Sequence, residues 1–265
     1  MQDHASLTLV GGPTLLVEVG GLRLLSDPTF DPPGVYPGPV TLEKLAGPAV
    51  PAEAVLPLDA VLLSHDQHAD NLDRAGRALL ERAPLVLTTP AGADRLPSAR
   101  GLAPWEWAAL PGRDGREWRV TATPARHGPP GIEPATGEVT GFVLADPEGE
   151  DVLYLTGDTV YFPGVAEVAR RFRPRLVVPF AGAPRPRGPF RVTMDANDAL
   201  ELAHAFPGAT LVPVHQEGWA HFTEGPADLA RAFEVLGQRG RLLVLKPGRA
   251  TPVELGRGAP AVSAR

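Results

Sequence analysis

Residues 61–73, VLLSHDQHADNLD, constrain the fold most, because an apolar run stops there and histidines and acidic residues follow at once. An all-apolar run such as residues 60–63 predicts a strand that is buried on both faces of its sheet. The polar cluster would then begin where the strand leaves the sheet, which is where α/β proteins place their binding sites. We therefore expect an α/β fold with a polar site at one edge of a sheet.

The histidines and carboxylates of this segment have the chemistry of a metal site. Zinc, manganese and iron accept imidazole nitrogen and carboxylate oxygen as ligands, and the close spacing lets one loop deliver several ligands to one point. A polar loop that ends in a helix cap explains the same residues, with Asp70, Asn71 or Asp73 as the cap. This segment alone leaves both interpretations open.

Composition excludes several classes of protein and site. The 265-residue chain has a formal charge of −6, whereas a nucleic-acid binder needs a basic face for the phosphates. The chain has no cysteine, so histidine, aspartate or glutamate must hold any metal. No apolar run approaches the length of a membrane span, and the N-terminal residues lack a signal-peptide pattern. We expect a cytoplasmic protein with one domain over residues 1–265 and a frayed tail at 249–265.

Short β-prone runs alternate with helical segments along the chain. The first three runs predict an antiparallel meander, and residues 28–57 predict a long loop, with a short helix at 41–45, that could act as a lid. Residues 194–206 predict a helix capped by Thr193, and residues 242–246 predict the last strand. This rhythm is typical of an α/β fold.

Three further polar side chains, His127, Asp158 and His215, each stand at the end of an apolar, strand-like run. Taken singly, each is explained by an ordinary loop or turn. Strands that end at one edge of a sandwich lie close together, so ligands from several of them can share a metal. We expect these three side chains to converge on the cluster of residues 65–70.

The order of these polar residues resembles the signature of the metallo-β-lactamase superfamily. That signature is His-x-His-x-Asp-His, followed by separate His, Asp and His residues. The corresponding residues here, in the same order, are His65, His68, Asp70, His127, Asp158 and His215. The resemblance covers roughly the whole chain.

Two further stretches are similar to one branch of that superfamily. Ser26-Asp27-Pro28 stands before the long loop, and Trp219-Ala220-His221-Phe222 follows His215. Both look like the branch that contains ascorbate-6-phosphate lactonase and N-acyl-phosphatidylethanolamine phospholipase D.

The resemblance implies a four-layer αββα sandwich of two mixed sheets flanked by helices, with one or two divalent ions at one sheet edge. The implied ligands are His65, His68 and His127 for the first ion, Asp70 and His215 for the second, and Asp158 between them. Asp70 and Asp158 would be catalytic, because Asp70 would orient an activated water and accept its proton. Zinc is the expected metal.

The sequence departs from the signature at two points. Two residues rather than one separate His65 from His68, and Asn71 stands where the last histidine of the signature should be. An amide is a poorer zinc ligand than imidazole, so two ions, one ion or a lapsed site all stay open. Manganese or iron is the alternative metal, because an amide oxygen is a harder ligand. Asn71 and Asp27 are candidates for a further ligand or for a group that holds a ligand in place.

Other residues are candidates for binding the substrate. Trp219 and His221 could line its pocket, with aromatic packing as the alternative for both. Arg185, Arg187 and Arg191 could bind an anionic group, although loop arginines are also common on surfaces.

The predicted function is a metal-dependent hydrolase that cleaves an ester, lactone or phosphoester bond in a small molecule, which could be anionic. A metal-binding protein without catalysis, or with one ion, is the alternative, and a nuclease is the less favoured one because of the acidic charge. We expect a small-molecule substrate and neither a nucleic acid partner nor a membrane span. The sequence leaves a homo-oligomer open.

Overall fold

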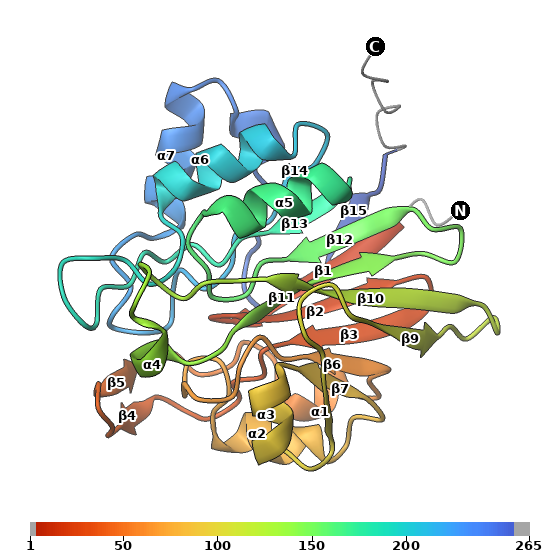
Figure 1. Cartoon of the computed structure of the whole chain (residues 1–265), viewed down its shortest axis with the longest axis horizontal. Coiled ribbons are helices and arrows are strands. Elements are labelled where there is room, and N and C mark those ends of the chain that lie inside the picture. The colour runs from red at the N-terminus through yellow and green to blue at the C-terminus, as the bar shows by residue number, and fades with distance from the viewer. Residues whose placement is uncertain (1–3, 257–265) are drawn as a thin grey trace.

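The computed structural model describes residues 4–256, and two mixed sheets form its centre (Figure 1). The first sheet begins with the predicted antiparallel meander, in which Gly20 and Gly21 adopt left-handed φ angles of 63° and 77° at the second turn. Its strands, in spatial order, are β15 (Thr251–Glu254), β1 (His4–Gly11), β2 (Thr14–Val19), β3 (Leu22–Ser26), β6 (Ala60–Leu62), β7 (Val86–Thr88) and β8 (Ala99–Gly101). The strands from β3 to β8 are parallel, so β3 and β6 end at the same edge.

The second sheet has six strands and also ends several of them at one edge. They are, in spatial order, β14 (Thr210–Leu211), β13 (Leu176–Val178), β12 (Asp151–Leu155), β11 (Thr140–Ala145), β10 (Glu117–Pro124) and β9 (Trp107–Pro111). Strand β11 is antiparallel to both β10 and β12, whereas β13 and β14 are parallel to β12. Strands β10, β12, β13 and β14 therefore all point toward the same edge.

Helices cover the outer face of each sheet and give the expected four-layer αββα sandwich (Figure 1). The helices on the first sheet are α1 (Ala52–Val55), α2 (Arg74–Leu80) and α3 (Pro90–Arg95), and those on the second are α5 (Pro163–Arg171), α6 (Ala196–Ala205) and α7 (Pro226–Val235). Apolar side chains of both sheets, among them Leu62, Trp118 and Leu144, fill the space between them. Burial of these faces drives the stacking of the layers.

A small two-stranded sheet, β4 (Gly34–Tyr36) and β5 (Leu42–Lys44), projects from the sandwich near the short helix α4 (Glu133–Thr136) (Figure 1). The long loop of residues 28–57 is therefore partly ordered, and the helix that we expected at residues 41–45 is wrong. We call residues 34–44, which form this small sheet, the flap. Lys44 anchors the flap through a buried ion pair with Asp73, 2.9 Å long. The backbone N–H of Leu45 donates to the carbonyl of Gly218 at 2.8 Å.

Three other predictions from the sequence need correction. Asp195, not Thr193, caps α6, because its carboxylate accepts from the Asp198 N–H at 2.9 Å. Residues 242–246 form only a single β-bridge, between Leu242 and Leu211. The first part of the expected frayed tail is strand β15, which pairs with β1; residues 257–265 lie outside the described part of the chain. Within residues 4–256, we find no helix with the length and apolar character that a membrane crossing requires.

Candidate metal centre

Strand ends from both sheets bring the predicted polar residues together at one edge of the sandwich. His65 follows β6 of the first sheet, while His127, Asp158 and His215 follow β10, β12 and β14 of the second. All four side chains are buried. The convergence that the strand-end pattern predicts is therefore present in the structure.

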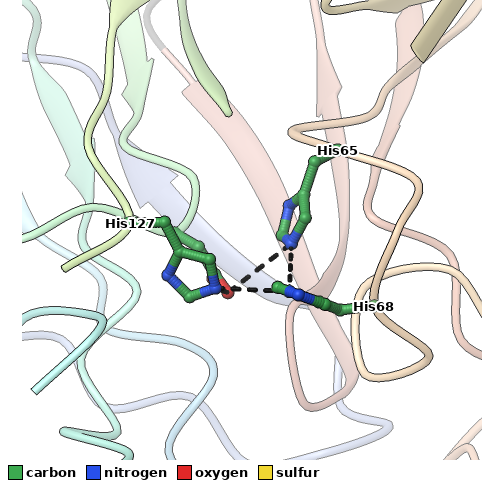
Figure 2. Close-up of side chains that lie close together, drawn as sticks. His65, His68 and His127 are labelled. Carbon is green, nitrogen blue, oxygen red and sulfur yellow. Dashed lines mark hydrogen bonds and ion pairs between the residues drawn. The ribbon is translucent and has the colours of Figure 1, made fainter. Parts of the chain in front are cut away.

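Three histidines converge on one point (Figure 2). The Nδ1 atom of His68 lies 2.8 Å from Nε2 of His65 and 3.2 Å from Nε2 of His127. Together with Asp158, these side chains each offer one ligand atom, and the four atoms lie within 4.8 Å of one another. Three imidazoles and a carboxylate are a set that can surround one divalent ion, and we call these four residues the metal group.

Hydrogen bonds turn the ligand nitrogens of this group inward. Nδ1 of His127 donates to the carbonyl of Val192 at 2.7 Å, so its Nε2 carries the free lone pair. Nδ1 of His65 lies 2.9 Å from the Ser64 hydroxyl, which leaves Nε2 of His65 facing the other histidines. Burial lowers the pKa of His65, and it lowers the pKa of His68 to about 4; the neighbouring histidine charge adds to both shifts. Neutral, inward-facing imidazoles of this kind fit a bound cation.

Asp158 lies between this group and a second group of polar residues. Its Oδ2 is 3.5 Å from Nε2 of His127, and its Oδ1 accepts from Nδ1 of His215 at 2.9 Å. Burial by itself would raise the pKa of Asp158, but the charge and hydrogen bond of His215 hold it well below its usual range. Asp158 is therefore ionised and shared by both groups.

The second group contains Asp70, His215 and His221. Oδ2 of Asp70 lies 3.4 Å from Nε2 of His215 and 2.9 Å from Nε2 of His221. The sequence predicts Asp70 and His215 here, and the structure adds His221, which comes from the loop after β14. Trp219-Ala220-His221-Phe222 marks that loop in the sequence, but only the fold shows that His221 reaches Asp70.

Asn71 and Asp27 lie behind Asp158. The Nδ2 atom of Asn71 is 3.4 Å from Oδ1 of Asp158 and 3.5 Å from Oδ2 of Asp27. Asp27 also accepts from the backbone N–H of Ser64 at 2.6 Å, which ties the end of β3 to the residue before His65. Among the described residues, Oδ1 of Asn71 is buried and has no hydrogen-bond partner.

Two residues stand between His65 and His68, and one of them, Asp66, has a structural role that the sequence did not reveal. The Asp66 side chain turns away from the metal group, and its two oxygens accept from Nε and Nη2 of Arg95 at 2.9 and 2.5 Å. Arg95 lies in the last turn of α3, so this bidentate pair fixes the loop that carries both histidines to a helix. The sequence signal for this pair is Asp66 itself, an acidic residue between the two histidines in addition to Asp70.

Replacing Arg95 with alanine is expected to weaken metal binding by about 10- to 100-fold, because Asp66 would no longer hold the loop between the two histidines. Metal titration followed by calorimetry measures this change. Arg100→Ala, which removes an exposed arginine from β8, is the control. Equal affinities in the two variants would show that the Asp66–Arg95 pair does not position the ligands.

His68, His127 and Asp158 of the metal group form the floor of a cavity of about 230 Å³. The flap lines one side with Tyr36, Val40 and Leu42, and the loop of residues 184–192 lines the other with Pro186 and Arg187. His221 also lines the cavity, whereas the other three predicted substrate residues lie elsewhere. Trp219 is buried behind Tyr36, with ring centroids 5.4 Å apart, and is absent from the cavity wall; Arg185 is exposed, and Arg191 pairs with Asp195.

A four-layer αββα sandwich with buried histidines and carboxylates at the edge of its paired sheets has the architecture and the donor groups of a metal-dependent hydrolase. Comparison with known proteins gives the same class. The model of the family described as beta-lactamase superfamily domain matches residues 22–216. The chain belongs to this superfamily, in the metallo-β-lactamase form that its sequence resembles.

Similar proteins extend over nearly the whole chain. A metal-dependent hydrolase from Caldivirga maquilingensis is 26% identical over 245 residues, which cover 91% of this chain and 95% of the relative. Another from Pyrobaculum aerophilum is 27% identical over 244 residues, which cover 90% and 95%.

Solved structures show the same fold. An isothiocyanate hydrolase from Delia radicum gut bacteria has a TM-score of 0.80 and 24% identity, and the match covers 94% of this chain and 99% of that one. A metallo hydrolase from Ignicoccus hospitalis has a TM-score of 0.73 and 21% identity over 95% of this chain and 99% of its own.

Proposed function

We propose that this metal-dependent hydrolase cleaves an ester, lactone or phosphoester bond in a small, anionic molecule. The observation that carries the proposal is the cavity: its floor holds His68, His127, Asp70 and Asp158, and Arg187 stands on its wall. About 230 Å³ suits a small molecule rather than a polymer.

His65, His68, His127 and Asp158 would hold one divalent ion, and Asp70 and His215 would contribute to a second. Bound there, zinc would act as a Lewis acid that activates water and polarises the substrate; manganese or iron is the alternative. Two buried groups that share Asp158 favour two ions over one.

Side chains of the protein would bind the substrate and accept the proton of the attacking water. Asp70 lies on the cavity wall with its Oδ2 2.9 Å from Nε2 of His221, so this carboxylate would orient the attacking water and accept its proton. Val40, Leu42 and Pro184 would exclude water from the reacting bond. The Arg187 guanidinium would bind the acidic group of the substrate.

Metal analysis and a substrate panel test this proposal. We expect gently purified protein to contain divalent metal and to hydrolyse at least one lactone, carboxylester or phosphodiester, with activity lost on adding chelator and restored by zinc. An isothiocyanate belongs in the panel, because one protein with this fold is an isothiocyanate hydrolase. No metal after reconstitution would favour a binding protein without catalysis, and chelator-sensitive cleavage of RNA would favour a nuclease.

Replacing Arg187 with alanine is expected to raise KM for anionic substrates by roughly tenfold or more and to leave kcat nearly unchanged. A hydrogen bond to a charged group contributes about 1.5–3 kcal/mol, and this one would bind a part of the substrate remote from the reacting bond. Steady-state kinetics on an anionic ester and its neutral analogue measure the effect. Arg185→Ala, in the same loop but exposed, is the control; equal KM values in both variants would contradict the assignment.

A further inference from the structure

We infer that His221 is a ligand of the second metal ion and takes the place of the histidine that Asn71 replaces in the signature. The inference rests on the proposed function and deepens it, because it assigns this site a residue that lies outside the signature motif. It follows from the orientation of Asn71, the position of His221 and the donor atoms around Asp70.

Asn71 turns its donor end toward the site. Its Nδ2 lies 3.4 Å from Oδ1 of Asp158, an ionised carboxylate that can only accept, and 3.5 Å from Oδ2 of Asp27. An amide held in this way orients Asp158 through its N–H group. The imidazole nitrogen that the signature supplies at this position is missing, so the second group lacks one ligand.

His221 approaches the same group from another part of the fold. Its Nε2 is 2.9 Å from Oδ2 of Asp70, and Nε2 of His215 is 3.4 Å from that same oxygen. Two imidazoles and one carboxylate therefore meet at one point. This is the donor set of catalytic zinc sites of the His₂-carboxylate type.

Two ring nitrogens in this group lack partners. Among the described residues, Nε2 of His215 and Nδ1 of His221 are buried without a hydrogen bond. Leaving a buried polar atom without a partner is unfavourable, so the arrangement leaves room for a further bond at the Asp70–His215–His221 group. A bound cation would give Nε2 of His215 a partner.

The loop that carries His221 is fixed rather than free. The Ala220 N–H donates to the carbonyl of Glu43 at 3.0 Å, and Lys44 and Trp219 form a β-bridge. The His221 ring packs against Phe222, with centroids 4.6 Å apart. The flap strand β5 therefore holds His221 beside Asp70, in the way that supporting contacts position metal ligands.

Zinc binding by four proteins tests the inference: wild type, His221→Ala, Asn71→Ala, and His221→Ala combined with Asn71→His. Each is stripped with chelator, reconstituted with zinc, desalted and measured by elemental mass spectrometry, and zinc affinity is measured by calorimetry. We expect about two zinc ions in wild type and Asn71→Ala, about one in His221→Ala, and recovery of the second ion in the double variant. The affinity of the second site should fall at least about 10-fold in His221→Ala.

Circular dichroism confirms that each variant is folded, His221→Gln provides a second variant at this position, and His204→Ala, an exposed histidine on α6, is the control. A His221→Ala protein that keeps two ions with wild-type affinity would overturn the inference. So would loss of the second ion in Asn71→Ala alone, which would make the amide oxygen the ligand, or a wild-type protein with one ion. Absence of zinc from the wild type would instead overturn the proposed function.

Discussion

Replacing Asp158 with asparagine is expected to reduce turnover by more than roughly 100-fold and to lower the metal content of the protein. The carboxylate contributes one oxygen beside His127 and uses the other to accept from Nδ1 of His215. The amide keeps the shape of the side chain but removes the negative charge that both groups share. Without that charge, only histidines would hold the first ion, and Asp70 would be the one carboxylate left at the second.

Kinetics on whichever ester, lactone or phosphoester is hydrolysed, together with elemental analysis, measure this effect. Asp114→Asn is the control, because Asp114 is exposed in the turn between β9 and β10 and does not line the cavity. A folded Asp158→Asn protein with normal turnover would contradict the proposed centre. A loss of stability alone, with metal content and turnover intact, would give Asp158 only a structural role.

Replacing Asp73 with alanine is expected to lower the free energy of unfolding by about 4 kcal/mol or more. The carboxylate is fully buried and accepts four hydrogen bonds, from Phe30 N, Asp31 N, Gly76 N and Nζ of Lys44. Its loss would leave the Lys44 ammonium buried without a partner, at a cost of about 3–5 kcal/mol, and would also remove the cap of α2.

Thermal and denaturant unfolding measure this change, and Thr89→Ala is the matched control. Thr89 caps α3 through a single bond from the Gly92 N–H at 2.9 Å and has no ion pair, so its loss should cost only about 1 kcal/mol. In Lys44→Met combined with Asp73→Ala, part of the stability should return, because no buried charge then lacks a partner. Equal losses for Asp73→Ala and Thr89→Ala would show that the ion pair contributes nothing.

The Asp73 variant should also affect the site, because Lys44 and Asp73 anchor the flap that carries Tyr36 and Leu42 over the cavity. This link joins a stability residue to substrate binding. It also explains why Lys44, one of only two lysines in the chain, is buried rather than exposed.

Most strands of the two large sheets and the principal polar residues of the site follow from local patterns in the chain. The apolar run of residues 60–63 becomes a buried strand, because a sheet covered on both faces admits mainly apolar side chains, whereas the run at 242–246 forms only one β-bridge. His65, His127, Asp158 and His215 follow such runs, and strand ends meet at a shared edge. These features depend on neighbours along the chain, so they can be read before the fold is known.

Which other residues join the site depends on contacts between segments far apart in the chain. Arg95 reaches Asp66, His221 reaches Asp70, and Lys44 reaches Asp73 across separations of 29, 151 and 29 residues. Trp219 and Arg185 are residue types that often line pockets. In the structure, however, Trp219 packs behind Tyr36 and Arg185 is exposed to solvent. Local pattern determines where a strand ends, whereas the contacts of a loop side chain depend on how distant layers pack against one another.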